Sequence, residues 1–138
     1  MTGIYQHTID AKGRLFIPSK LREELGETFY ITISAEECLS AYSLEDWNVR
    51  LEKIKAMPKS KQRKMRPLFS HAAKCELDSQ GRILIPKELR GFAKLDKNVT
   101  VVGSGECAEI WDREKWNEVD MIETTPENIA DVFRELDF

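Results

Sequence analysis

Two short polar motifs carry the side chains of this sequence that are best suited to binding a ligand. The first runs from Asp10 to Arg14 (DAKGR) and the second from Asp78 to Arg82 (DSQGR), so each places a carboxylate four positions before an arginine. A guanidinium oriented by a carboxylate can present its planar fork to a phosphate or to a guanine base. The same pair can instead only pin a hairpin, which contributes about 0 to 1 kcal/mol at an exposed site. The residue types leave both interpretations open.

Each motif is expected to form a tight turn between two strands. An aspartate can accept a hydrogen bond from the backbone two residues on, and Gly13 and Gly81 tolerate a positive φ. Alternating apolar residues before the first motif and an apolar run after it predict the flanking strands. The turn tips, Lys12 and Gln80, then project outward, where lysine can meet a phosphate and glutamine can read adenine.

The two motifs belong to a fifteen-residue unit that occurs twice, as TIDAKGRLFIPSKLR at 8–22 and ELDSQGRILIPKELR at 76–90. The match resumes downstream with an offset larger by one, where Cys38 and Trp47 recur as Cys107 and Trp116. Two copies are too few for a solenoid. We therefore expect the halves to pair about an approximate two-fold axis and to share one core. A chain of 138 residues is large enough for this, whereas one half alone would be marginal.

The same order of elements is expected in both units: strand, turn, strand, short helix, two strands and an amphipathic helix. The predicted strands are 5–9, 14–17, 29–34 and 39–42 in the first unit, and 75–77, 82–85, 99–103 and 108–111 in the second. Pro18 and Pro86 open the short helices, and Ser43 and Asp112 cap the long ones. The first long helix is expected to bury a face with Trp47, Leu51 and Ile54. The second is expected to bury the corresponding face with Trp116, Val119 and Ile122. Residues 62–70 form a linker or a short helix.

A last helix begins at Thr125 and carries an apolar stripe of four residues, Ile129, Val132, Phe133 and Leu136. Such a stripe must pack on its own chain or on a neighbour, and the sequence does not choose between them.

Composition predicts a soluble globular protein, with 41% hydrophobic and 33% charged residues. There is no membrane-spanning run and no signal peptide, so we expect no membrane association. The three cysteines are widely spaced and odd in number, which is typical of reduced thiols in the cytoplasm. Because Cys38 and Cys107 occupy the same repeat position, we interpret them as small core residues.

Charge is strongly segregated along the chain. Residues 53–74 hold eight lysines and arginines and no acidic residue, whereas residues 106–138 hold eleven acidic residues against three basic ones. A basic segment can steer towards phosphates even when the net charge is −3. It can equally be a solvated helix face, and both interpretations stay open.

The sequence holds no convergent set of acid, base, nucleophile or metal ligands. The two histidines, His7 and His71, have no partner at metal-ligand spacing, and no zinc-protease, nucleophile-elbow or phosphate-loop motif is present. We predict no enzyme activity, no metal and no cofactor. His7 has Cys75 as its repeat counterpart and is interpreted as a core or interface histidine.

The paired units resemble the AbrB/SpoVT swapped-hairpin DNA-binding family. Two such units in a chain of this length look like MraZ proteins, transcriptional regulators of bacterial division and cell-wall gene clusters. The resemblance implies an α+β fold in which two units interleave their hairpins into a small β-barrel with flanking helices. It also implies that Arg14 and Arg82 contact DNA, that Asp10 and Asp78 support them, and that copies assemble into a ring. Lys12 matches the family's frequent basic turn tip, whereas Gln80 departs from it.

The sequence and the resemblance together predict four segments: a first unit at 5–47, a basic linker region at 48–75, a second unit at 76–119 and an amphipathic helix at 120–138. The expected function is a cytoplasmic, nucleoid-associated regulator that binds repeated boxes of double-stranded DNA and represses its own promoter. The alternative is an antitoxin-like module that presents its acidic C-terminal helices to a basic protein. The duplicated unit disfavours it, because such antitoxins resemble the single-unit form with a largely disordered tail, whereas both helices after Asp112 carry apolar stripes.

Overall fold

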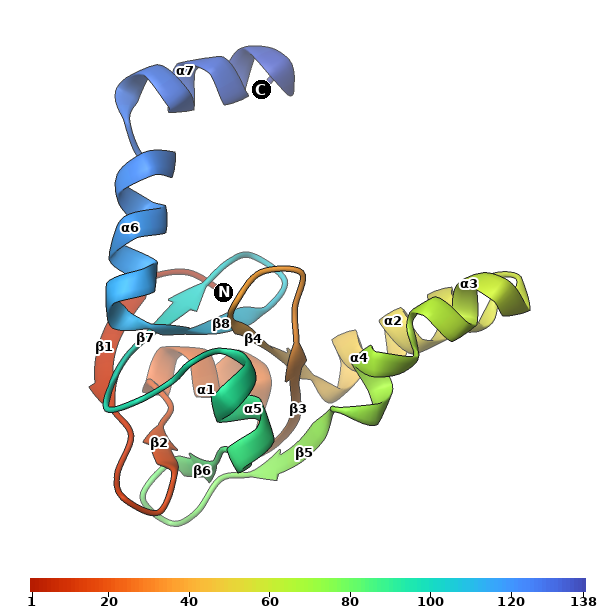
Figure 1. Ribbon diagram of the computed structural model, residues 1–138, viewed down its shortest axis with the longest axis vertical. Coiled ribbons are helices and arrows are strands. Elements are labelled where there is room, and N and C mark those ends of the chain that lie inside the picture. The colour runs from red at the N-terminus through yellow and green to blue at the C-terminus, as the bar shows by residue number, and fades with distance from the viewer.

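Eight strands form two sheets in the computed structural model, which describes residues 1–138 (Figure 1). The first unit contributes β1 (Ile4–Thr8), β2 (Arg14–Phe16), β3 (Thr28–Ile33) and β4 (Leu39–Ser43). The second contributes β5 (Ala73–Glu76), β6 (Arg82–Leu84), β7 (Asn98–Gly103) and β8 (Ala108–Asp112). The large sheet has the order β1-β7-β8-β4-β3-β5, the small sheet pairs β2 with β6, and every pairing is antiparallel.

Seven helices complete the α+β fold. They are α1 (Ser19–Leu25), α2 (Leu44–Lys55), α3 (Lys59–Lys64), α4 (Arg66–Ser70), α5 (Lys87–Phe92), α6 (Arg113–Glu123) and α7 (Pro126–Glu135). The segment predicted as a linker or short helix is therefore helical, with Pro67 in the first turn of α4, where a missing N–H costs nothing. No helix combines the length and the apolar character needed to cross a bilayer.

The strand order has an internal two-fold symmetry. Exchanging each strand for its repeat counterpart reverses the order of the large sheet and leaves it otherwise unchanged. The register places repeat-equivalent residues opposite each other at two points, Ser40 with Glu109 between β4 and β8, and Leu15 with Ile83 between β2 and β6. The approximate axis runs through both points. The prediction of a pseudo-two-fold pair from the duplicated sequence is confirmed.

Each unit lends its first hairpin to the other. Strand β1 of the first unit pairs with β7 of the second, and β5 of the second pairs with β3 of the first. Within the first hairpin, only an isolated bridge between Ile9 and Leu15 joins the two strands. The units are thus interleaved, as the family resemblance implied, and neither completes its sheet alone.

Helix ends follow the caps expected from the sequence. The Ser43 hydroxyl accepts a hydrogen bond from the backbone of Asp46, and the Asp112 carboxylate accepts one from Lys115. Thr125 caps α7 in the same way. These bonds satisfy backbone donors that lack a partner inside the helix, so three sequence-predicted helix starts are confirmed.

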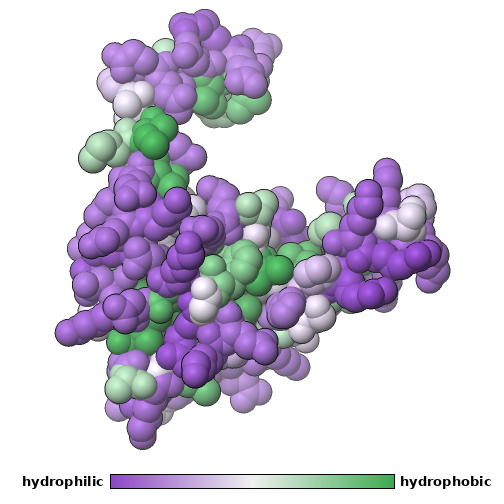
Figure 2. Space-filling model, in the orientation of Figure 1, coloured by the Kyte–Doolittle hydropathy of each residue, from purple (hydrophilic) through white to green (hydrophobic).

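Two helical arms extend from the sheets, one formed by α2, α3 and α4 and the other by α6 and α7 (Figures 1 and 2). On α2, Trp47 and Ile54 are buried as predicted. On α6, Ile122 is 71% exposed, because that helix continues past the sheet on which Trp116 packs. The stripe of α7 is not covered by its own chain, since Phe133 and Leu136 are 49% and 69% exposed.

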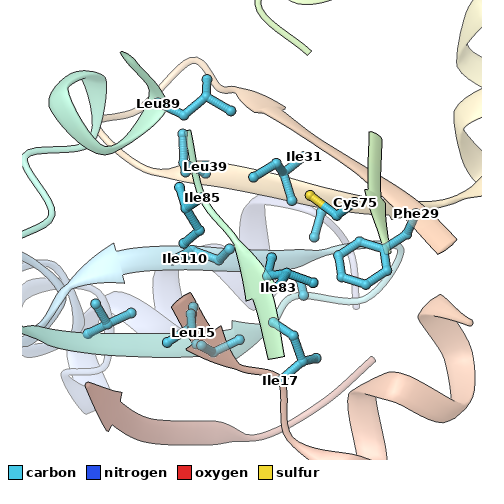
Figure 3. Packing of buried hydrophobic residues seen from close by; sticks show 14 of the residues in the cluster. Leu15, Ile17, Phe29, Ile31, Leu39, Cys75, Ile83, Ile85, Leu89 and Ile110 are labelled. Carbon is cyan, nitrogen blue, oxygen red and sulfur yellow. The ribbon is translucent and has the colours of Figure 1, made fainter. Parts of the chain in front are cut away.

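The main core lies between the small and the large sheet and is built jointly by both units. It contains 18 buried residues, half of them from each unit. Figure 3 shows Leu15, Ile17 and Ile83 of the small-sheet region directed towards Phe29 and Ile110 of the large sheet. Because burying apolar area is the dominant stabilising contribution, neither unit can keep its share of this core without the other.

The cysteines and His7 behave as packing residues. All three thiols are free and buried, and burial raises the pKa of Cys38 and of Cys75 to about 12. Such thiols are inert, which confirms the interpretation of Cys38 and Cys107 as core residues. His7 packs on the Phe16 ring with centroids 5.1 Å apart, and burial, aided by the charge of Arg113, lowers its pKa.

Candidate nucleic-acid interface

The first turn is organised by the carboxylate of Asp10. Its Oδ1 accepts hydrogen bonds from the backbone N–H of Lys12 at 3.0 Å and of Arg14 at 2.9 Å. Its Oδ2 accepts the Nε–H of Arg14 at 2.7 Å. One carboxylate therefore fixes both the path of the turn and the direction of the arginine side chain.

The second turn repeats this arrangement around Asp78. The backbone N–H groups of Gln80 and Arg82 both donate to Oδ1 at 2.9 Å, and the Nε–H of Arg82 donates to Oδ2 at 2.9 Å. Two turns with different sequences at the tip thus have the same internal hydrogen bonding. The shared hydrogen bonds use the side chains of the aspartate and the arginine and do not depend on the side chains at the turn tip.

In each turn we call the hydrogen bonds between the aspartate and the arginine the clamp, and both clamps keep the carboxylate ionised. The backbone hydrogen bond from Arg14 is the largest cause that lowers the pKa of Asp10, from its ordinary 3.8 to about 2, with further contributions from the Arg14 side chain and Lys12. The corresponding hydrogen bonds, led by that of Arg82, lower the pKa of Asp78. At neutral pH each turn is therefore a fully formed ion pair.

Both arginines keep free donors. Arg14 and Arg82 use Nε for the clamp, and neither donates a terminal Nη–H in a hydrogen bond within the chain. Their side chains are 35% and 27% exposed. A guanidinium held at Nε with its Nη atoms open is prepared for a bidentate contact, because little side-chain entropy remains to be lost.

The two turns lie side by side at one end of the molecule (Figure 1). Pairing of β2 with β6 sets Phe16 opposite Arg82, and Arg82 Nη1 comes within 3.9 Å of Asp10 Oδ2, in the other turn. The tips, Lys12 and Gln80, are exposed. All four residues predicted to contact DNA therefore come from neighbouring turns of one surface, which we call the turn surface (residues 10–14 and 78–82).

Each turn is supported from behind by the other unit. The carbonyl of Gly13 accepts the N–H of Ile85, and the carbonyl of Gly81 accepts that of Ile17, both at 2.9 Å. The glycines have φ of +85° and +76°, a region that disfavours a side chain. The interleaving of the hairpins thus holds the two turns at a fixed relative position.

Two further arginines complete the support. A Cβ built on Gly13 would lie 3.0 Å from the guanidinium carbon of Arg90, and one built on Gly81 would overlap the guanidinium of Arg22. Arg22 also lies over the Phe16 ring at 5.0 Å. Arg22 and Arg90 are the last residues of the two fifteen-residue units, and the sequence alone indicated no role for them. Their contact with the opposite unit's glycine follows only from the interleaving.

Comparison with known proteins shows which family the chain resembles. The family model described as "MraZ protein, putative antitoxin-like" matches residues 1–66 and 68–128, two stretches that each contain one turn. A protein of Carboxydothermus hydrogenoformans named transcriptional regulator MraZ is 51% identical over 118 residues, which cover 83% of this chain and 82% of the relative.

Proposed function

The chain belongs to the MraZ family, and we propose that it is a sequence-specific DNA-binding transcriptional regulator that represses the promoter of its own division and cell-wall gene cluster. The observation that carries the proposal is the turn surface, where two clamped arginines with open Nη donors lie side by side. The matching relative is named as a regulator and not as an enzyme, in agreement with the prediction that the chain is not an enzyme.

Each residue of the turn surface has a proposed role. Arg14 and Arg82 contact base edges, where a bidentate guanidinium recognises guanine O6 and N7. Lys12 meets a phosphate and Gln80 meets adenine or a phosphate, so the two turns read different positions. Asp10 and Asp78 aim the arginines, and the two glycines allow the backbone of each turn to bend.

The four sequence segments take corresponding roles in the proposal. Residues 5–47 and 76–119 are the two recognition units, 48–75 is a basic connection and 120–138 is an amphipathic tail. The protein acts in the cytoplasm, at the nucleoid, on double-stranded DNA. Copies of the chain assemble, most simply in a ring, so that several turn surfaces meet repeated promoter boxes.

A second candidate function is an antitoxin-like interaction with a basic protein. It is favoured by α7, whose apolar residues Ile129, Phe133 and Leu136 are 40%, 49% and 69% exposed beside acidic side chains. The turn surface has no part in that function, whereas it is central to the regulator. We therefore favour the regulator.

Binding of promoter DNA by the purified full-length chain tests the proposal. Fluorescence anisotropy compares a fragment from upstream of the protein's own gene with a shuffled fragment at the same salt concentration. We expect at least about 10³-fold tighter binding to the promoter fragment, as is typical of specific regulators. Equal affinity for both fragments contradicts the regulator. A basic protein that co-purifies in fixed ratio with a chain unable to bind the promoter supports the antitoxin-like function instead.

A further inference from the structure

The two arms have equivalent origins and opposite charge. Helices α2 and α6 start at repeat-equivalent positions, after Ser43 and Asp112, so the pseudo-two-fold axis generates both arms. Within the first arm, the stretch from the end of α2 to the start of β5, residues 53–74, holds eight lysines and arginines without an acidic residue, and we call this stretch the basic arm. Residues 113–138, the acidic arm, hold eight acidic residues and three basic ones. The duplicated architecture thus ends in two different and complementary surfaces.

The acidic arm exposes large apolar side chains. Six of them are at least 40% exposed: Met121, Ile122, Ile129, Phe133, Leu136 and Phe138. Figure 2 shows this apolar surface on α6 and α7, set among polar side chains. Exposed apolar side chains surrounded by charge are typical of a protein interaction site, since leaving them in water is unfavourable.

The basic arm offers a hollow with an apolar floor. The hollow has a volume of about 600 Å³ and is lined by Lys59, Gln62, Arg63, Arg66, Phe69 and Ser70. Phe69 is half-buried and stacks edge-on against Trp47 with centroids 5.5 Å apart, so the floor is fixed. The cations at the rim are exposed. An apolar floor inside a basic rim matches an apolar stripe inside an acidic rim.

We propose that the acidic arm of one copy docks on the basic arm of a second copy, with the apolar face of α7 over the hollow between α3 and α4. The inference rests on the proposed homo-oligomer and names the surfaces that join its copies. The two arms of one copy diverge from the sheets, so they do not satisfy each other (Figure 1). The chain therefore carries one unpaired surface of each sign.

Such an interface is heterologous, because it joins two different surfaces. Each copy accepts one neighbour and is accepted by another, which gives a closed ring or an open filament. Both arms project away from the end that holds the turn surface (Figure 1). Docking through the arms consequently leaves every turn surface free to meet DNA, and the same placement favours a protein partner over DNA for the basic arm.

Paired charge reversal tests the interface in the full-length chain. One variant changes Lys59, Arg63 and Arg66 to glutamate, and the other changes Glu118, Glu127 and Glu135 to lysine. All six side chains are exposed, so both variants should fold like the parent by circular dichroism. Multi-angle light scattering at micromolar concentration should give an assembly of more than two copies for the parent and a monomer for each variant.

The decisive sample is the equimolar mixture of the two variants. In the first variant the rim of the hollow is acidic, because all three of its cations are reversed. In the second variant the docking arm is slightly basic, because its eight acidic and three basic residues become five and six. Each variant therefore repels itself and attracts the other at both ends. We expect the mixture to recover the mass of the parent assembly. A matched control that changes the exposed Lys20, Lys87 and Lys97 to glutamate should keep the parent mass. Parent-like assembly of either arm variant, or a mixture that stays monomeric, overturns the proposed interface.

DNA binding by the same variants separates this inference from the proposed function. The two variants should bind a single promoter box with the same affinity, because their turn surfaces are unchanged. If only the first variant loses affinity, and its log Kd against log salt is shallower by about 0.9 per lost phosphate contact, the basic arm binds DNA and the interface is wrong. If the parent assembles through the arms but binds no promoter, the interface stands and the regulator is wrong.

Discussion

At the scale of single residues, Arg14 and Arg82 decide recognition in the proposed function. Replacing either by alanine should weaken binding to a single promoter box by about 1 to 3 kcal/mol, or about 5-fold to 150-fold in Kd, because one bidentate base contact is lost. Fluorescence anisotropy measures the change, and circular dichroism checks the fold. Arg134→Ala is the matched control, since that exposed arginine also pairs with a nearby aspartate but lies on α7. If both variants bind like the parent, the Asp–Arg pairs only stabilise the hairpins and do not contact DNA.

Asp10 gives the turn surface a defined response to acid. Its pKa in the folded chain, about 2, lies below its ordinary value of 3.8. The ionised clamp therefore stabilises the fold above the ordinary pKa, and this contribution is lost as pH falls through the folded pKa. Between pH 4 and pH 2 the melting temperature should fall more steeply for the parent than for Asp10→Asn, in thermal unfolding followed by circular dichroism. Identical slopes would mean that the clamp does not form in solution.

The Asp–Arg pairs of the turns could be predicted from the sequence, whereas the arginines that support the turns could not. Asp10, Arg14 and their counterparts could be identified because the motif recurs with its spacing intact. Arg22 and Arg90 recur equally well, yet their place behind the opposite unit's turn depends on how the hairpins interleave. The recurrence of a residue indicates that both units need it, but only the three-dimensional arrangement shows which contact it makes.

At the scale of elements, both backbone geometry and packing favour glycine at the two turn positions, Gly13 and Gly81. Gly13→Ala and Gly81→Ala should each destabilise the chain by about 1 to 2 kcal/mol, because a side chain disfavours positive φ. Gly91→Ala is the control, since Gly91 lies in α5 with nothing within 4 Å of a new Cβ, and should stabilise by about 0.5 to 1 kcal/mol. Urea unfolding measures all three. Equal effects at Gly13 and Gly91 would contradict the described turn.

Most elements could be predicted from the sequence, whereas their partners could not. Alternation located the strands, and the caps at Ser43, Asp112 and Thr125 located three helices. Periodicity identifies a strand without naming its neighbour, so the pairing of β1 with β7 was implied only by the family resemblance. A helical stripe likewise predicts an apolar face but not its cover. This is why Ile122 was expected to pack and is 71% exposed.

At the scale of the whole molecule, assembly should convert several weak contacts into one strong one. Once one turn surface binds a box, the next binds intramolecularly, so a fragment with three boxes should bind about 100-fold or more tightly than one with a single box. Inserting about five base pairs between boxes rotates them by half a helical turn and should abolish the gain. Anisotropy titrations of the three fragments test this. Equal affinity for one box and three would contradict it, as would a monomeric chain at micromolar concentration.

Hydrogen–deuterium exchange with and without promoter DNA reports where DNA contacts the chain, and so tests whether the turn surface is the DNA-binding site. We expect promoter DNA to slow exchange in peptides covering 10–14 and 78–82, and a shuffled fragment at the same salt concentration to do so far less. Exchange in α6 and α7 should not respond to a single box. Protection confined to other segments, with both turns unchanged by promoter DNA, would contradict the assignment of the turn surface as the DNA-binding site.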